Sequence, residues 1–128
     1  MSHFTRIKTS LAKKEYLLQA LCDLGYQPEE GRVCIKGYGG QETEVELMIP
    51  SGNPGYELGF KKNGEAYELV ADWYGIKNIQ PERFLNQVRQ RYAYHVVKSR
   101  MTEQGFEVVE EENQEDHTIH ITVRRMVF

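Results

Sequence analysis

The sequence lacks the residues and motifs that mark most catalytic and metal-binding families. Its 128 residues include two cysteines, Cys22 and Cys34, too few for a disulfide framework and too far apart for a short metal-binding spacing. We therefore expect two partly buried free thiols in a reducing compartment. None of the GxSxG, HExxH, CxxC or Walker patterns is present. The sequence therefore predicts no metal, no cofactor and no motif-defined catalytic residue. It favours a protein that is not an enzyme.

Long apolar runs and an excess of basic residues are also missing. No run approaches the roughly 20 apolar residues that span a bilayer. The first ten residues, MSHFTRIKTS, carry charges but no apolar stretch of the kind found in a secretory signal. Lysine and arginine number 16 against 19 aspartates and glutamates, which gives a net charge of −3. We expect a soluble, cytoplasmic protein without membrane insertion, and the charge argues against a nucleic-acid partner, because general nucleic-acid binders are usually basic.

Hydrophobic periodicity predicts seven strands and two helices along the chain. The first helix, at about 12–24, ends at Gly25, which can take the left-handed conformation of a helix stop. The second helix begins at Pro81 and ends at Gly105. The strands are expected at about 3–9, 32–37, 43–49, 56–62, 65–73, 106–111 and 117–125.

This order, β-α-β-β-β-β-α-β-β, predicts the α+β class, with an antiparallel sheet and two helices packed on it. The first seven elements follow the order of the TATA-binding-protein-like fold, an analogy of architecture that carries no function. A length of 128 residues is typical of one domain, so residues 1–128 are expected to form a single domain.

The sequence KKNGEA at 61–66 predicts a tight hairpin, because Asn-Gly is the favoured pair for a two-residue type I′ turn. With Asn63 and Gly64 at the centre of the turn, Phe60 would lie opposite Tyr67. The apolar residues of both strands would then share one face, as a half-buried hairpin requires.

The second helix changes character along its length. A rotation of about 100° per residue puts one stripe of side chains toward the core, and this stripe contains Leu85, Val88, Tyr92, Val96 and Ser99, with Phe84 and His95 at its border. A second apolar stripe on nearly the opposite side contains Tyr94, Val97 and Met101, and two basic residues between the stripes are Arg91 and Lys98. Such a stripe must be covered either by the C-terminal hairpin of the same chain or by another chain. We therefore regard the second stripe and the two basic residues beside it as a candidate interface for a protein partner or a second copy. This interface consists of Tyr94, Val97, Met101, Arg91 and Lys98.

A second candidate site is a pocket between the sheet and the long helix. Histidine titrates near neutral pH, and His95 lies about one helical turn from Tyr92, an arrangement that acid–base chemistry could use if another group came near. Asp72 is the candidate second group, and Trp73 is a candidate wall of the pocket. The alternative is that His95 is a structural group at the border of the core, which is the commoner situation for a histidine in this position.

The C-terminal strands carry two further histidines and an acidic stretch. His117 and His120 are three residues apart, and on a strand this spacing sends them to opposite faces, so they are not expected to form a metal pair. The acidic residues at 110–116 lack the spacing of a calcium loop and are expected to form a solvated hairpin end.

Several strings along the chain carry a resemblance to a known family. They are, in order, MSHFTRIKT, VCIKGYGGQ, YELGF, YELVADWYG, QRYAYH and GFEVVEEE. Together they resemble the hypothetical chloroplast reading frame thirty-five family, small proteins of cyanobacteria and plastids that belong to a domain-of-unknown-function family. The resemblance covers nearly the whole chain. It implies a soluble protein of a photosynthetic lineage, in the cytoplasm or, if organelle-encoded, in the plastid stroma, and it brings no assigned reaction and no catalytic residue.

Two functional hypotheses follow from the residues. The leading one is a non-enzymatic interaction or assembly factor that works through the long helix, since one part of that helix is apolar on two sides. The alternative is a small-molecule-binding domain or an enzyme, with its pocket between the sheet and the long helix near Trp73, Tyr92 and His95.

Overall fold

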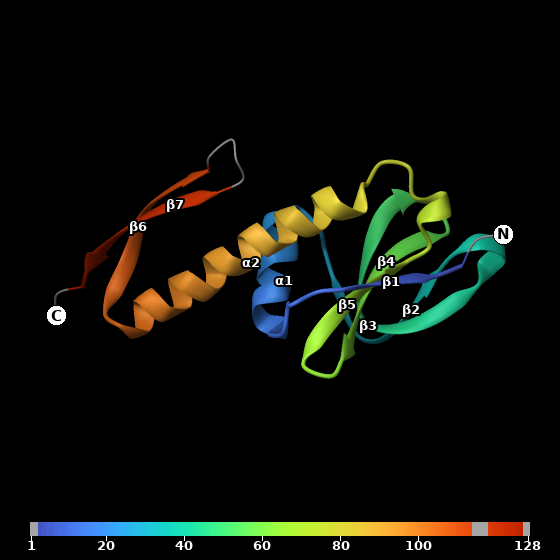
Figure 1. Ribbon diagram of the computed structural model, residues 1–128, viewed down its shortest axis with the longest axis horizontal. Coiled ribbons are helices and arrows are strands. Elements are labelled where there is room, and N and C mark those ends of the chain that lie inside the picture. The colour runs from blue at the N-terminus through green and yellow to red at the C-terminus, as the bar shows by residue number, and fades with distance from the viewer. Residues whose placement is uncertain (1–2, 114–117, 127–128) are drawn as a thin grey trace.

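The computed structural model describes residues 3–113 and 118–126 of the chain (Figure 1). It confirms the α+β class and the predicted order of strands and helices. The helices are α1 (Lys14–Asp23) and α2 (Pro81–Glu103), and two short 3₁₀ turns are η1 (Tyr38–Gly40) and η2 (Trp73–Gly75). The strands are β1 (Thr5–Lys8), β2 (Glu29–Lys36), β3 (Glu42–Asn53), β4 (Tyr56–Asn63), β5 (Ala66–Ala71), β6 (Phe106–Asn113) and β7 (Ile119–Arg125).

The strands form two separate antiparallel sheets rather than one. Five of them pair in the order β1-β5-β4-β3-β2, and β6 pairs with β7 in a two-stranded sheet. Figure 1 shows the β6–β7 hairpin near the C-terminal end of α2, with α1 between it and the five-stranded sheet. That the whole chain forms one domain stays a prediction.

The main hydrophobic core lies between the two helices and one face of the five-stranded sheet. Leu17 and Leu21 of α1 and Leu85 and Val88 of α2 are fully buried against it. The sheet contributes alternate residues of its central strands, namely Leu47, Ile49, Leu58, Phe60, Leu69 and Ala71. Each fully buried side chain of this size contributes roughly 1.5–3 kcal/mol to stability. The first half of α2 is therefore anchored by burial, as its predicted core stripe requires.

The β4–β5 hairpin forms where predicted, but its register differs by two residues. Asn63 pairs with Ala66, so Gly64 and Glu65 form the turn, and Phe60 lies opposite Leu69. Gly64 takes a left-handed φ of 70° at the first central position of the turn, whereas the prediction placed it at the second. Because a shift of two residues leaves every side chain on its original face, the predicted core residues remain buried.

The structure also bears on the predictions for the cysteines, the membrane and the acidic stretch. Cys22 and Cys34 are free, as predicted, but both are exposed, so the expectation of partial burial is wrong. Neither helix of the described residues combines the length and the apolar character needed to cross a bilayer. His117 and residues 114–116 of the acidic stretch lie outside the described residues.

Candidate functional site

The four residues of the predicted pocket divide between two parts of the molecule. Asp72 and Trp73 lie in the connection between β5 and α2. Tyr92 and His95 lie well inside α2, about 16 Å and 21 Å along the axis from Pro81 at 1.5 Å per residue. Tyr92 and His95 both contact residues of α1 or of the segment just before it. The structure therefore brings Tyr92 and His95 together beside α1. Asp72 and Trp73 lie apart from them, in the connection before the start of α2.

Asp72 joins two short turns at one end of the five-stranded sheet. Its side chain is 1% exposed. The backbone N–H of Tyr38 donates to Asp72 Oδ2 at 2.9 Å, and the N–H of Tyr74 donates to Oδ1 at 3.2 Å. The exposed rings of Tyr38 and Tyr74 then meet edge to face, with centroids 5.5 Å apart. Trp73 is half-buried against the main core.

Sequence reasoning missed this tyrosine pair. An aromatic residue followed by glycine occurs directly after strands in both KGYGG and DWYG, and that repetition is the signal that could have found it. The carboxylate of Asp72 is used to hold the two turns, which gives it a structural role.

Tyr92 caps the start of α1. The backbone N–H groups of Ala12 and Lys13 donate to its hydroxyl oxygen at 3.2 Å and 2.8 Å. Lys13, the N-cap residue of α1, supplies no side-chain cap of its own. The ring of Tyr92 also meets that of Tyr16 edge to face at 5.8 Å. The hydroxyl therefore satisfies the amide of the N-cap residue Lys13, which has no intrahelical acceptor, and the amide of the residue before it.

An ionic cluster connects α1, α2 and β6. Asp23 Oδ2, at the end of α1, accepts a hydrogen bond from Arg91 Nε at 2.8 Å and lies 2.6 Å from His95 Nε2. Arg91 Nη1 donates to Glu111 Oε1 of β6. The Arg91 guanidinium also stacks over the ring of Tyr94, 4.4 Å from its centroid. One guanidinium thus contacts both helices and the hairpin.

The pKa values in this cluster follow from burial and charge. Burial raises the pKa of Asp23, but the hydrogen bonds from Arg91 and His95 and the charge of Arg91 lower it more, so the pKa lies below its ordinary value. For Tyr94, burial and then the nearby Glu111 carboxylate raise the pKa. Asp23 is therefore ionised and Tyr94 is protonated at neutral pH.

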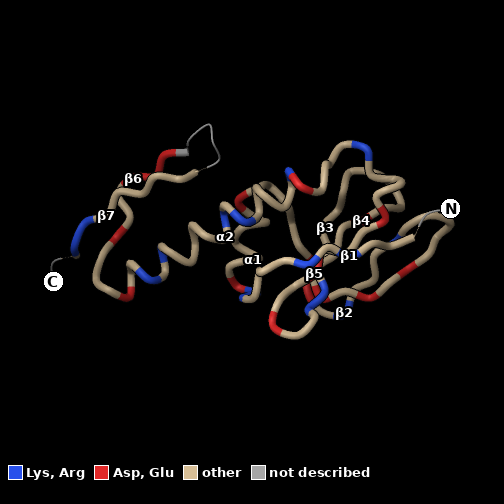
Figure 2. The backbone as a smooth tube through the Cα atoms, in the orientation of Figure 1, with Lys and Arg blue, Asp and Glu red and all other residues tan. Residues whose placement is uncertain are grey.

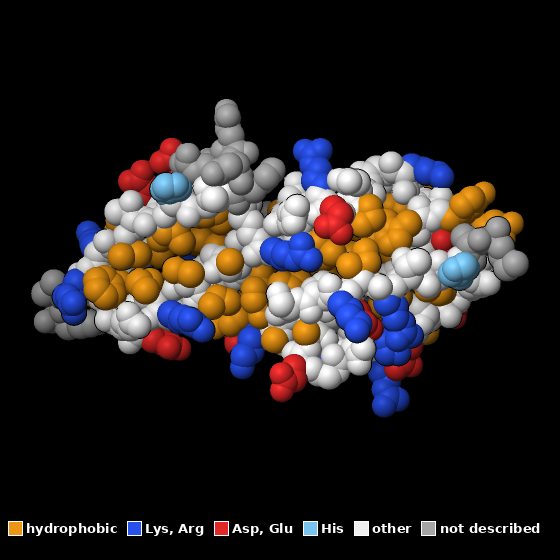
Figure 3. All heavy atoms as spheres, viewed as in Figure 1, with side chains coloured by type: hydrophobic (Ala, Val, Ile, Leu, Met, Phe, Trp, Pro, Cys, Tyr) orange, Lys and Arg blue, Asp and Glu red, His pale blue; other side chains and the backbone are white. Residues whose placement is uncertain are grey.

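The predicted second stripe of α2 is covered only in part. Tyr94 is 8% exposed, whereas Val97 is 42% exposed. A groove of about 270 Å³ separates α2 from the start of β7, and it is lined by Gln90, Ala93, Tyr94, Val97, Thr118, Ile119 and Ile121. Figure 3 shows hydrophobic side chains gathered over the hairpin and the adjoining part of α2. The chain's own hairpin therefore covers Tyr94 and leaves an open apolar groove beside Val97.

The other three predicted interface residues, Met101, Lys98 and Arg91, do not line this groove. Met101 is half-buried one turn beyond Val97. Lys98 is exposed, with its ammonium 5.9 Å from the Tyr94 ring centroid. Arg91 is held inside the ionic cluster.

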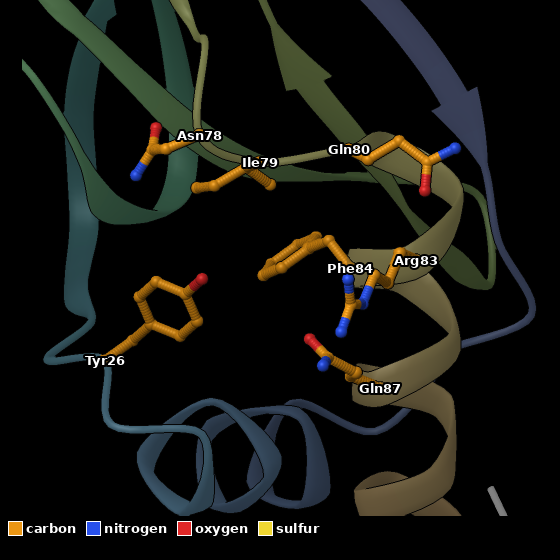
Figure 4. Close-up of a pocket in the computed structure, with 7 residues that line it drawn as sticks. All are labelled: Tyr26, Asn78, Ile79, Gln80, Arg83, Phe84 and Gln87. Atoms are coloured by element: carbon orange, nitrogen blue, oxygen red, sulfur yellow. The ribbon is translucent and has the colours of Figure 1, made fainter.

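A separate hollow lies at the start of α2 (Figure 4) and was not predicted from the sequence. It has a volume of about 270 Å³ and is lined by Tyr26, Asn78, Ile79, Gln80, Arg83, Phe84 and Gln87. Figure 4 shows Arg83 and Gln87 on α2 across the hollow from Tyr26. Burial raises the pKa of Tyr26, so its phenol is protonated at neutral pH. These groups can hydrogen-bond a small polar molecule.

Metal binding finds no support in the part of the chain that the structure describes. Among residues 3–113 and 118–126, no group of three or more histidine, cysteine, aspartate or glutamate side chains is placed to hold a metal ion.

These observations define an α+β protein in which a hairpin is docked on the far half of a long helix. The family described as "Protein of unknown function (DUF1257)" matches residues 20–122. The chain is 38% identical over 128 residues to "Uncharacterized protein ycf35" of Guillardia theta and 36% identical over 126 residues to the protein of that name in Cyanophora paradoxa, with 98% of each chain covered in both pairs. No solved structure matches the chain. The chain therefore belongs to the DUF1257 family, which confirms the resemblance found in its sequence.

Replacing Tyr92 by phenylalanine should lower stability. The substitution removes the oxygen that accepts from Ala12 and Lys13 and keeps the ring, so we expect a loss of about 1–2 kcal/mol in the free energy of unfolding. Urea denaturation measures this loss. The control is Tyr16→Phe, which keeps the edge-to-face ring contact and should change stability by less than about 0.5 kcal/mol. Equal stability of Tyr92→Phe and the unsubstituted protein would refute the capping role.

Replacing Asp23 by asparagine should remove part of the acid sensitivity of folding. Because the folded-state pKa of Asp23 is depressed, its contribution is fully present above the unfolded pKa of about 3.9 and is lost as pH falls through the folded value. The stability difference between the protein and Asp23→Asn should therefore be largest above about pH 4 and vanish in stronger acid. Unfolding measured across this range tests the sign, with Glu65→Gln at an exposed position in the β4–β5 turn as the control. A difference that grows on acidification would contradict it.

Proposed function

We propose that this protein is a non-enzymatic interaction factor that binds a protein partner at the groove between α2 and β7. The observation that carries the proposal is the groove itself, in which apolar side chains of both elements meet and Val97 is 42% exposed at the edge. Exposed apolar surface of this kind is typical of interaction sites.

The surroundings of the groove support a binding role. Arg91 fixes β6 to α2 through Glu111 and packs over Tyr94, the residue at the floor of the groove. A surface that is ordered before binding loses less conformational entropy when a partner arrives. Of the five predicted interface residues, Tyr94 and Val97 line the groove, Lys98 and Met101 follow them along α2, and Arg91 packs over Tyr94.

The hollow at the start of α2 favours a second candidate function, the binding of a small polar molecule. Arg83 and Gln87 face Tyr26 across it, and all three carry hydrogen-bonding groups. This candidate is weaker because Arg83 is exposed, while buried polar groups that converge on a ligand are the usual mark of such a site.

We also propose where the protein acts. Its relatives in Guillardia theta, Cyanophora paradoxa and Pyropia yezoensis are proteins of algae. Membership of this family supports a role in a photosynthetic lineage, in the plastid stroma where the gene is organelle-encoded and in the cytoplasm otherwise.

The interaction function is tested with two matched substitutions on the hairpin side of the molecule. Val97→Asp places a charge at the edge of the groove. Val109→Asp places the same charge on β6, at a valine that is similarly exposed (48%) but does not line the groove. Tagged proteins are expressed in the native cell, and co-purifying proteins are quantified by mass spectrometry. We expect Val97→Asp to reduce recovery of the specific partner at least about tenfold and Val109→Asp to leave it unchanged.

Thermal melts should be nearly unchanged for both variants, because exposed substitutions cost little stability. The proposal fails if the two variants recover the same partners in the same amounts. It also fails if no protein is enriched by the unsubstituted chain.

A further inference from the structure

β7 lines one side of the groove and has one backbone edge that no other described strand pairs with. β6 and β7 pair only with each other among the described strands, so the outer edge of each presents backbone N–H and C=O groups that no third strand satisfies. Such edges can accept an additional strand. The groove is lined by Thr118, Ile119 and Ile121 but by no residue of β6, so it opens on the β7 side of the hairpin.

The two edges of the hairpin differ in their capacity to pair. β6 carries an irregularity between Val108 and Glu110, where Val109 is the extra residue. A bulge and a series of charges are the features by which natural edge strands avoid pairing, and β6 has both, with glutamates at 107, 110, 111 and 112. β7 has no extra residue between Ile119 and Arg125. β7, which lines the groove, is therefore the strand with the regular edge.

The side chains of β7 define what a third strand would need. Ile119, Ile121 and Val123 are partly buried toward α2, and His120, Thr122 and Arg124 alternate with them on the exposed face. Apolar side chains of an incoming strand would therefore lie over the groove, beside Ala93 and Val97 of α2. Side chains of the opposite face would lie beside His120 and Arg124, where a carboxylate is favoured.

The chain already contains one strand of this chemistry. In β6, Phe106 and Val108 alternate with Glu107, and Arg124 Nε donates to Glu107 Oε1 across the ladder. Figure 2 shows the acidic residues of β6 and the basic residues at the end of β7. Arg124 thus already contacts a carboxylate from the neighbouring strand, and its exposed guanidinium leaves room for another on the outer side of β7.

We infer that β7 accepts a third strand from the partner, an extended segment in which apolar residues alternate with acidic ones. This inference rests on the proposed function and specifies its mode of binding. Backbone hydrogen bonds to the β7 edge would supply affinity, and the alternation of apolar and acidic side chains would supply selectivity.

The test uses a capped peptide of alternating valine and glutamate, of about eight residues to match a typical strand. Three comparison peptides are an alternating valine–lysine peptide, a peptide with the same valines and glutamates in two blocks, and a valine–glutamate peptide methylated on alternate backbone nitrogens. Binding is measured by fluorescence anisotropy, and hydrogen exchange reports the protection of each β7 amide. We expect the valine–glutamate peptide to bind at least about tenfold more tightly than the others and to slow exchange along β7.

Substitutions in the full chain locate the site. Val97→Asp and Arg124→Glu should each weaken binding of the valine–glutamate peptide, and Arg124→Glu should also improve binding of the valine–lysine peptide. Val109→Asp should change neither. The melt of each variant is measured alongside, so that a loss of binding is compared only between folded proteins.

The results separate this inference from the proposed function. Equal binding of all four peptides, or unchanged exchange along β7, overturns strand addition, and the proposed function still stands if Val97→Asp loses the cellular partner. Protection of β7 by self-association, seen as a concentration-dependent increase in mass during sedimentation without peptide, also overturns it, because a second copy would then occupy the edge. Selective binding with protection of β7 supports the inference even if the partner captured from cells does not depend on Val97.

Discussion

The contact of the Arg91 guanidinium with two carboxylates determines how the two parts of this protein are joined. Asp23 belongs to α1 and the main body, Glu111 belongs to the hairpin, and Arg91 contacts both from α2. Its side chain is 16% exposed, so its charge interactions are screened less than those of a surface pair. A two-stranded hairpin is marginally stable alone. Its place on α2 therefore depends on this ionic cluster and on the apolar contacts that the cluster holds in register.

The long helix has two environments along its length. Its first half contributes Phe84, Leu85 and Val88 to the main core, and its second half extends past the sheet to the hairpin (Figure 1). The second half is where apolar side chains are least completely covered, as the exposure of Val97 shows. Stability is concentrated in one half of α2 and accessible surface in the other, which is the division expected when a rigid element presents a binding surface.

The local patterns of the sequence predicted the elements because each depends on neighbours in the chain. Periodicity placed Leu85 and Val88 in the core and Tyr94 and Val97 on the opposite stripe, and both assignments match the burial of α2 and its contacts with β7. The β4–β5 turn was predicted in place but off by two residues, because two-residue turns centred on either side of Gly64 are compatible with the same apolar faces.

Contacts between segments that are far apart in the sequence could not be predicted from hydrophobic periodicity. The sequence could not show that Asp23 meets Arg91, 68 residues away, or that Tyr92 caps the start of α1. The prediction paired Asp72 with His95 because both can act in acid–base chemistry. In the structure Asp72 lies before the start of α2 and His95 lies several turns into it. The division of the strands into two sheets had no local signal either, because it depends on which strands pair with one another and not on the pattern within any one strand.

Arg91 couples the hairpin to α1 and the five-stranded sheet, and hydrogen exchange in an Arg91→Met variant tests this coupling. Methionine keeps much of the apolar contact with Tyr94 but removes both ionic contacts. We expect amides of β6 and β7 to exchange at least about tenfold faster, as follows from the loss of a local stabilising contact, while amides of the five-stranded sheet keep their protection. Unchanged exchange in β6 and β7, or an equal loss of protection in both sheets, would contradict it.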